Sequence, residues 1–324
     1  MTQSAQPELL VSARQRTLRL LIVIPHFFSV SAPNGINRSR SAQARDERLR
    51  ALMATLGGLH QTFGLAIYGL DHSSRTAWQA APAIRHLIDI VICTTGDAHL
   101  LGSLPPQHPP YRHHTATIEP EMLGFECHRL LHDARGRYDY YGYLEDDIVL
   151  LDPLFFRKRQ SFDKRFGPAA LLQPNRYEAR PEGPVHKLYV DYHLVPSRTA
   201  PYQDIRDQPR LEMPFLDETI VFERTSYPSA GCFFLNEDQL RIWADGPAYD
   251  DRDVSYLSPL DSAVTLSVMK TFRIYKAVLD QAWFLEILHA SPRWIDSVSA
   301  LTRLAPRETP FASHLHRERH DRRS

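Results

Sequence analysis

Short apolar runs alternate with segments of helical periodicity through the first half of the chain. The runs predict strands at 19–24, 64–70, 88–95 and 140–144. The patterns between them predict helices at 38–56 and 120–134. Strands that alternate with helices are typical of α/β proteins, in which a mainly parallel sheet carries helices on both faces. We therefore expect a Rossmann-like, nucleotide-binding first half.

The second half is richer in proline, and its strands need not be parallel. The strand-like runs are AALLQP, HKLYVDY, TIVFER, GCFFLN, RIYKAVL and AWFLEILH. Capping boxes that begin at Asn236 and Ser258 predict two helix starts. The segments 104–120 and 174–184 are predicted to be surface loops that line a binding cleft. These elements predict a smaller second sheet beside the first.

The chain divides into two halves of one domain between two polar ends. Residues 18–152 form the predicted nucleotide-binding half, and residues 153–304 form the second half of the same domain. Residues 1–17 and 305–324 lack a regular apolar period and are predicted to be disordered.

Composition excludes several classes of protein. The 324 residues include 38 Lys and Arg against 38 Asp and Glu, so the net charge is zero and we expect no nucleic-acid partner. The apolar run Leu20–Ile24 is far shorter than the ~20 residues that span a bilayer. We therefore expect no transmembrane segment and, without a secretory signal, a cytoplasmic protein. The three cysteines form no CxxC pair, which predicts reduced core thiols rather than disulfides or a structural zinc site. No pattern indicates an oligomeric state.

The most informative stretch is YLEDDIVLLDPLFF, in which Glu145, Asp146 and Asp147 follow a predicted buried strand. In open α/β sheets, ligands bind outside the carboxyl ends of the strands. Three carboxylates between apolar flanks need a positive partner, because burial of bare anions is costly. Mg²⁺ or Mn²⁺ suits them, because such a cation takes one or two carboxylates and completes its shell with phosphate oxygens and water. The alternative is an acidic turn that faces solvent.

In this stretch the sequence resembles the GT-A fold glycosyltransferases, and LEDDIVL is similar to the EDD form of their DxD motif in the N-acetylglucosaminyltransferase I type. SAGCFFLNEDQL, PLDSAVTL and FLEILHAS extend the resemblance over most of 19–290. It implies a metal-dependent glycosyltransferase with a GT-A sheet and a smaller acceptor-side sheet. The donor would be a nucleotide-sugar, taken as a UDP-sugar, and the acceptor a carbohydrate or another hydroxyl compound.

The resemblance also implies roles for individual residues. Asp147 would bind Mn²⁺ or Mg²⁺ directly, and His289 would be a further ligand. Asp146 and Glu145 would lie near the ribose and the metal-bound waters. Such a cation would stabilise the charge that develops on a diphosphate leaving group.

A general base would deprotonate the acceptor hydroxyl, and Asp261 is the first candidate. Its position in the box SPLD gives an equally good structural explanation, because a carboxylate there caps a helix. Glu218, together with its neighbour Asp217, is the reserve candidate.

The end of the first strand should also face the cleft. Pro25 and His26 are candidates for contact with the base, and Asn37 and Arg38 for contact with phosphate or ribose near a helix N-terminus. The arginines further along this helix, Arg45, Arg48 and Arg50, are interpreted as a solvated face.

Sixteen histidines also raise the question of zinc. His128 and His132 have ligand spacing on one predicted helix, but residue 129 is Arg, so the HExxH motif is absent. A structural role is favoured, although one of the two rings could approach the cleft.

Two alternatives to a glycosyltransferase remain: a sugar-phosphate nucleotidyltransferase, and a GT-A-like carbohydrate-binding protein without turnover.

Overall fold

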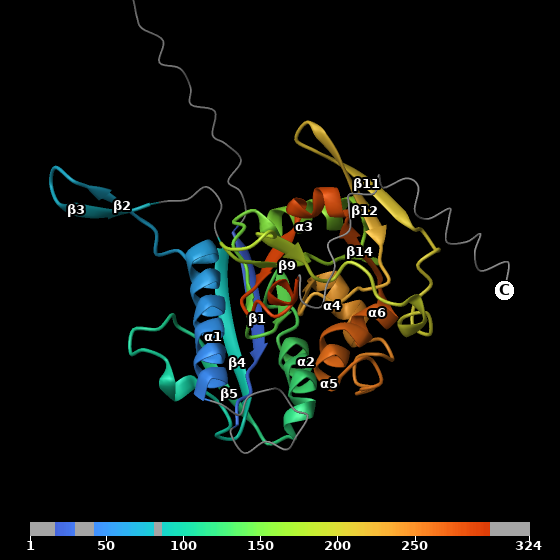
Figure 1. Ribbon diagram of the computed structural model, residues 1–324, viewed down its shortest axis with the longest axis horizontal. Helices are drawn as coiled ribbons and strands as arrows, with labels where there is room; N and C mark the ends of the chain where they lie inside the picture. The colour runs from blue at the N-terminus through green and yellow to red at the C-terminus, as the bar shows by residue number, and fades with distance from the viewer. Residues whose placement is uncertain (1–16, 30–41, 81–85, 299–324) are drawn as a thin grey trace, which may run out of the picture.

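A computed structural model describes residues 17–29, 42–80 and 86–298 of the chain (Figure 1). The ends predicted to be disordered lie almost entirely outside the described residues, as does the predicted start of the first helix. The prediction of a mixed α/β fold with a mainly parallel sheet is confirmed.

The central sheet of the described residues has five strands in the order β13-β6-β1-β4-β5. β1 (Leu18–Pro25), β4 (His86–Thr95), β5 (Arg112–Ala116) and β6 (Tyr140–Leu144) are parallel, and β13 (Cys232–Asn236) is antiparallel to β6. β1 and β6 are almost wholly buried, because helices cover both faces of the sheet. The carboxyl ends of β1 and β6 therefore lie side by side at one edge.

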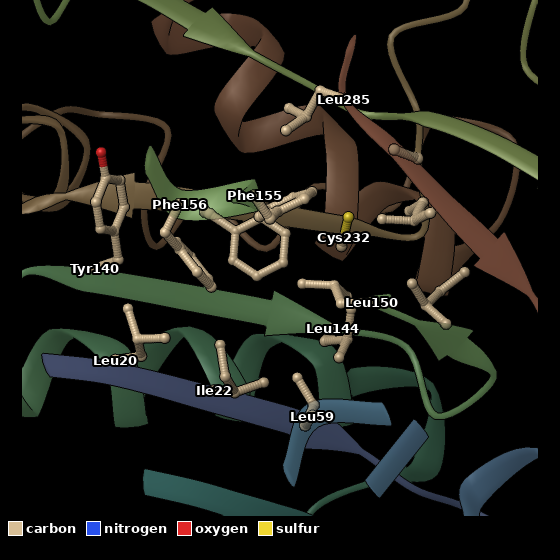
Figure 2. Close-up of a cluster of buried hydrophobic side chains, with 14 of the residues drawn as sticks. Leu20, Ile22, Leu59, Tyr140, Leu144, Leu150, Phe155, Phe156, Cys232 and Leu285 are labelled. Carbon is tan, nitrogen blue, oxygen red and sulfur yellow. The ribbon is translucent and has the colours of Figure 1, made fainter. Parts of the chain in front are cut away.

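Alternate residues of β1 enter two different cores. Leu20 and Ile22 pack against α1 (Ala42–Phe63) and α3 (Phe155–Phe166), together with Phe155 and Phe156 (Figure 2). Leu21 and Val23 belong to the second core, with α2 (Leu123–Asp133) and α4 (Glu237–Ala244). This alternation follows from the two-residue period of a strand between two helical layers.

Two smaller sheets form most of the second half. One has the order β10-β9-β15-β7 and the other β11-β12-β14-β8. Their strands are β7 (Ile148–Val149), β8 (Ala170–Leu172), β9 (Asn175–Ala179), β10 (Lys187–Tyr189), β11 (Arg210–Phe215), β12 (Glu218–Arg224), β14 (Arg273–Ala277) and β15 (Glu286–His289). Because β7 directly follows the acidic triplet and pairs with β15, it brings the segment after His289 next to the carboxyl end of β6.

Both predicted capping boxes start helices. Asn236 accepts a bond from the backbone N–H of Gln239, and Gln239 reciprocates. Ser258 caps α5 (Pro259–Asp261), which continues through a π-helical turn, Ser262–Leu266, into α6 (Ser267–Thr271). α5 contacts the 3₁₀ turn Pro120–Met122, which leads into α2.

Three expectations for local structure were wrong. The run 64–70 does not enter the main sheet: its end belongs to β2 (Tyr68–Asp71), which pairs only with β3 (Thr76–Gln79) in a projecting hairpin (Figure 1). The segment 104–120 contains β5, and 174–184 contains β9. Both strands begin with polar residues, which concealed them among loop signals.

The described helices include none long and apolar enough to cross a membrane. All three cysteines are buried and free, which confirms the prediction of reduced core thiols.

Candidate functional site

The acidic triplet follows β6 at the predicted edge and lines a cavity of about 370 Å³. Asp146 and Asp147 are only 3% and 5% exposed, so the alternative of a solvent-facing acidic turn is wrong. The described residues around this cavity come from the ends of β1, β6 and β15, from α1, from the start of α2 and from α5. Its lining is Pro25, Phe27, Ala44, Glu47, Arg48, Pro120, Glu121, Leu123, Gly124, Glu145, Asp146, Asp147, Ser258, Pro259, Leu260, Ser291 and Arg293.

Asp146 is fixed by two basic side chains. His26 Nδ1 lies 2.5 Å from its Oδ2, and Arg48 donates to the same oxygen at 2.7 Å. The backbone N–H of Leu100 donates to His26 Nε2 at 3.1 Å, so this nitrogen must be an acceptor and the ring proton must sit on Nδ1. His26 is fully buried, and both of its nitrogens are engaged. His26 therefore orients Asp146 from within the core. The predicted contact of His26 with a base is wrong, because the buried ring cannot reach a ligand in the cavity.

Asp147 lies between His289 and Arg48. His289 Nε2 is 3.3 Å from Asp147 Oδ2, and Arg48 Nη1 is 3.7 Å from it. Burial would raise the pKa of Asp147, but the hydrogen bond and charge of His289 and the charge of Arg48 lower it below its usual range. The other oxygen, Oδ1, is buried and has no hydrogen-bond partner in the described residues. Asp147 thus keeps one acceptor uncommitted at the cavity.

Glu178, on β9, holds His289 from the opposite side. Its Oε1 lies 2.8 Å from His289 Nδ1, and its Oε2 accepts from the backbone N–H groups of Trp294 and Ile295, both at 2.7 Å. Burial alone would lower the pKa of His289, but Asp147 and Glu178 outweigh it and raise that pKa to about 9. The sequence does not single out Glu178, because the polar residues of β9 resemble a surface loop.

Glu145 faces a second group of buried charges. Its Oε2 lies 3.9 Å from Arg176 Nη1, while the Nε and Nη2 atoms of Arg176 donate to the two oxygens of Asp191 at 2.9 and 2.8 Å. Burial, with the neighbouring Asp147 charge, raises the pKa of Glu145. Gly231 packs against this carboxylate, since an added Cβ would lie 2.9 Å from Glu145 Oε2. Its backbone is also left-handed, with φ at +67°. A larger residue would therefore displace Glu145.

An apolar wall borders the acidic triplet on the side of β1. Pro25 and Phe27 at the end of β1 face the cavity, as do Pro120 and Leu123 at the start of α2. Gly124 keeps this corner tight, since an added Cβ would lie 2.4 Å from Ala263 Cβ. A flat, partly apolar group such as a nucleobase suits a wall of this kind. The prediction that Pro25 lies at the site is thus compatible with the cavity lining.

The described residues include no group of three or more His, Cys, Asp or Glu side chains that could hold a metal ion without other ligands. A divalent cation that binds phosphates does not need one, because one or two carboxylates suffice when the ligand supplies further oxygens. The unpartnered buried Oδ1 of Asp147 fits this requirement. Asp147 as a ligand of Mn²⁺ or Mg²⁺ therefore stays a prediction that the donor set accommodates. His289 as a ligand also stays a prediction; its Nε2 points at Asp147.

The other predicted residues lie in different places. Ser258 caps α5 by accepting from the backbone N–H of Asp261, and its hydroxyl donates to the Asp261 carboxylate at 2.6 Å. Ser258, Pro259 and Leu260 line the cavity, and Asp261 is absent from that lining. Asp261 as a general base stays a prediction. Glu218 is exposed where the β11–β12 hairpin enters β12 and is absent from the cavity lining. Asn37 and Arg38 lie outside the described residues.

The two histidines of α2 stay away from the cavity. His128 is buried and donates from Nε2 to the carbonyl of Ala263 at 2.8 Å. Burial lowers its pKa to about 4. His132 stacks on Tyr249 at the surface. Both histidines therefore have the structural role that the sequence favours: His128 packs in the core, and His132 stacks on a tyrosine.

Comparisons with known proteins return no matching family model and no matching curated protein. Among solved structures, the fold is similar to a CMP:2-keto-3-deoxy-manno-octonic acid synthetase complexed with CTP, with 11% identity and a TM-score of 0.34 over 80% of this chain and 89% of that chain. That protein is a synthetase and not a glycosyltransferase, so the prediction of a glycosyltransferase is corrected.

Proposed function

We propose that the chain is a divalent-cation-dependent nucleotidyltransferase, which transfers a nucleotidyl group from a nucleoside triphosphate to a sugar-derived substrate. The observation that carries the proposal is the unpartnered carboxylate oxygen of Asp147. This buried carboxylate follows the strand β6, faces the cavity and retains an oxygen without a partner in the described residues. A cation that also contacts phosphate oxygens would satisfy that oxygen.

The charge of the cavity supports the need for a cation. Its described lining contains the acidic residues Glu47, Glu121, Glu145, Asp146 and Asp147, but only two arginines, Arg48 and Arg293. A triphosphate would be repelled by this wall, because like charges in a partly buried site interact strongly. A bound divalent cation would reverse the local sign and let the phosphates approach the acids.

The apolar wall supports a nucleoside next to those phosphates. Phe27 and Pro25 lie at the end of β1, directly beside the end of β6 that carries the acids. A base against Phe27 would place its phosphates over the triplet. This is the edge at which open α/β sheets bind nucleotides.

The proposed reaction joins two substrates at the α-phosphorus. A negatively charged oxygen of the second substrate forms a bond to that phosphorus, and the bond to the bridging oxygen breaks, so that pyrophosphate leaves with the electron pair. A divalent cation held at Asp147 would neutralise the charge that develops on the leaving pyrophosphate. Within the chain, Asp147 offers its free oxygen, and His26 and Arg48 hold Asp146 in one orientation. His289 fixes the other oxygen of Asp147, and Glu178 fixes His289.

Nucleotide binding and pyrophosphate release test this function. Thermal unfolding of the full chain is followed with CTP, UTP, GTP and ATP, each with and without Mn²⁺, because a ligand of the folded state raises Tm. At least one triphosphate should raise Tm only when Mn²⁺ is present. With that triphosphate, sugar 1-phosphates and sugar acids are then screened for release of pyrophosphate. If no triphosphate stabilises the protein with Mn²⁺, the proposal fails.

A further inference from the structure

The cavity has two arginines with different surroundings. Arg48 is committed to protein carboxylates, because it donates to Asp146 and lies close to Asp147. Arg293 lines the same cavity, yet its guanidinium forms no hydrogen bond or ion pair in the described parts of the chain. A cationic group that faces a pocket without a protein partner is available to a ligand.

Hydrogen bonds to buried groups of the protein anchor the turn that carries Arg293. Glu178 is fully buried and accepts the backbone N–H groups of Trp294 and Ile295. The N–H of Ala290 donates to the carbonyl of Asp147 at 2.8 Å, and that of Arg293 donates to Ser291 at 2.8 Å. The turn is therefore tied both to the acidic triplet and to the carboxylate that orients His289. Such anchoring reduces the entropy that a ligand must overcome when it engages the turn.

This turn and the apolar residue Phe27 follow strands of two different sheets. Phe27 follows β1, which neighbours β6, whereas Arg293 follows β15, which pairs with β7 directly after the triplet. A nucleoside against Phe27 and a group at Arg293 would thus approach the acids from segments that belong to different sheets. The two segments differ in chemistry as well, because Phe27 is apolar, whereas Arg293 carries a guanidinium without a partner in the described residues.

Resting on the proposed function, we infer that Arg293 forms the recognition site for an oxyanion, a phosphate or a carboxylate, of the second substrate. A guanidinium binds either group through two parallel N–H donors, and the resulting bonds are charge-assisted. Glu178 is the positioning residue of this site, because it fixes the turn on which Arg293 stands.

The first test uses the anions alone, without nucleotide or divalent cation. Trp294 is adjacent to Arg293 and 55% exposed, so its fluorescence reports on the turn. Inorganic phosphate and acetate are titrated separately into the full chain at constant ionic strength, with EDTA present. Saturable quenching by at least one anion is expected, lost in Trp294→Phe. Arg293→Gln should weaken it at least ~10-fold, and Arg293→Lys should retain part of it as a point charge.

Arg206→Gln is the matched control, because Arg206 is an exposed arginine that is absent from the cavity lining. It should leave both titrations unchanged. Preference for phosphate over acetate, or the reverse, identifies which oxyanion the substrate carries. No saturable binding of either anion, or equal binding by wild type and Arg293→Gln, overturns the inference.

A second arm separates this inference from the proposed function. With Mn²⁺ present, Arg293→Gln should bind the triphosphate within about 2-fold of the wild type, a difference well below the 1.4 kcal/mol of a tenfold change. If triphosphate affinity instead falls as far as anion affinity, Arg293 holds the nucleotide, and the inference is wrong. If no triphosphate binds the wild type, the proposed function fails, while the anion titrations still decide the role of Arg293.

Discussion

His26 donates its Nδ1 proton to Asp146, 120 residues further along the chain, at a distance of 2.5 Å. The tautomer is set by the opposite nitrogen, which accepts the backbone N–H of Leu100. The imidazole thus connects the ends of β1 and β6 with the segment after β4, and it fixes a carboxylate that lines the cavity. This link explains how Asp146, one of the three neighbouring acids, keeps a defined orientation in a buried setting.

Removal of that link should cost stability and nucleotide affinity together. His26→Phe keeps a ring of similar size but leaves Asp146 with one donor fewer and the N–H of Leu100 unpaired. An unsatisfied buried group costs about 1–3 kcal/mol, so the free energy of unfolding should fall by that amount. Mn²⁺-dependent affinity for the triphosphate should fall as well. Urea unfolding and titration calorimetry measure the two effects, and unchanged unfolding would show that this bond is unimportant.

Asp147→Asn tests the predicted cation ligand with little change in shape. An amide oxygen is a weaker ligand than a carboxylate for a hard cation, so triphosphate affinity with Mn²⁺ should fall at least ~10-fold. Without Mn²⁺ the protein should remain folded, as circular dichroism would show. Glu218→Gln is the control, since this acid is exposed and outside the cavity lining, and it should behave as the wild type. Equal affinity in Asp147→Asn and Glu218→Gln would remove the cation from the proposal.

The predictable part of the fold is the part buried on both faces. β6 was predicted with its observed bounds, because Tyr140–Leu144 is uniformly apolar and ends at charged residues. β9 was not, because Asn175, Arg176 and Glu178 are polar. Their burial depends on partners that are distant in sequence, such as Asp191 and His289. A local apolar period carries no information about such pairs.

The same distinction applies to the site. Asp147 and His289 were named together from a family resemblance, and the structure brings them to 3.3 Å. Arg48 was interpreted as part of a solvated helix face, because nothing in the local sequence of α1 shows that one turn reaches Asp146. Its charge was visible in the sequence, but its partner depends on how α1 packs against the central sheet.

His128 should make stability depend on pH. Its folded pKa is about 4, below the usual 6.5, because the buried ring resists protonation. Its contribution is therefore complete above pH 6.5 and is lost as the pH falls from 6.5 to about 4, where the unfolded chain binds the extra proton. The loss amounts to about 3 kcal/mol. In His128→Gln the free energy of unfolding should fall less steeply between these pH values, by that amount. Urea unfolding at several pH values measures this difference. An equally steep fall in the variant and the wild type would contradict the prediction.

Gly231→Ala should disturb the site through Glu145. At φ +67° an alanine bears left-handed strain of about 1–2 kcal/mol, and its Cβ would also lie 2.9 Å from Glu145 Oε2. Gly136→Ala is the matched control, because Gly136 has φ +77° but nothing within 4 Å of an added Cβ. Both variants should lose stability by similar strain, whereas only Gly231→Ala should also weaken Mn²⁺-dependent triphosphate binding, because it moves a carboxylate of the cavity. Equal binding by the two variants, measured by calorimetry below their Tm, would show that the position of Glu145 has no bearing on the ligand.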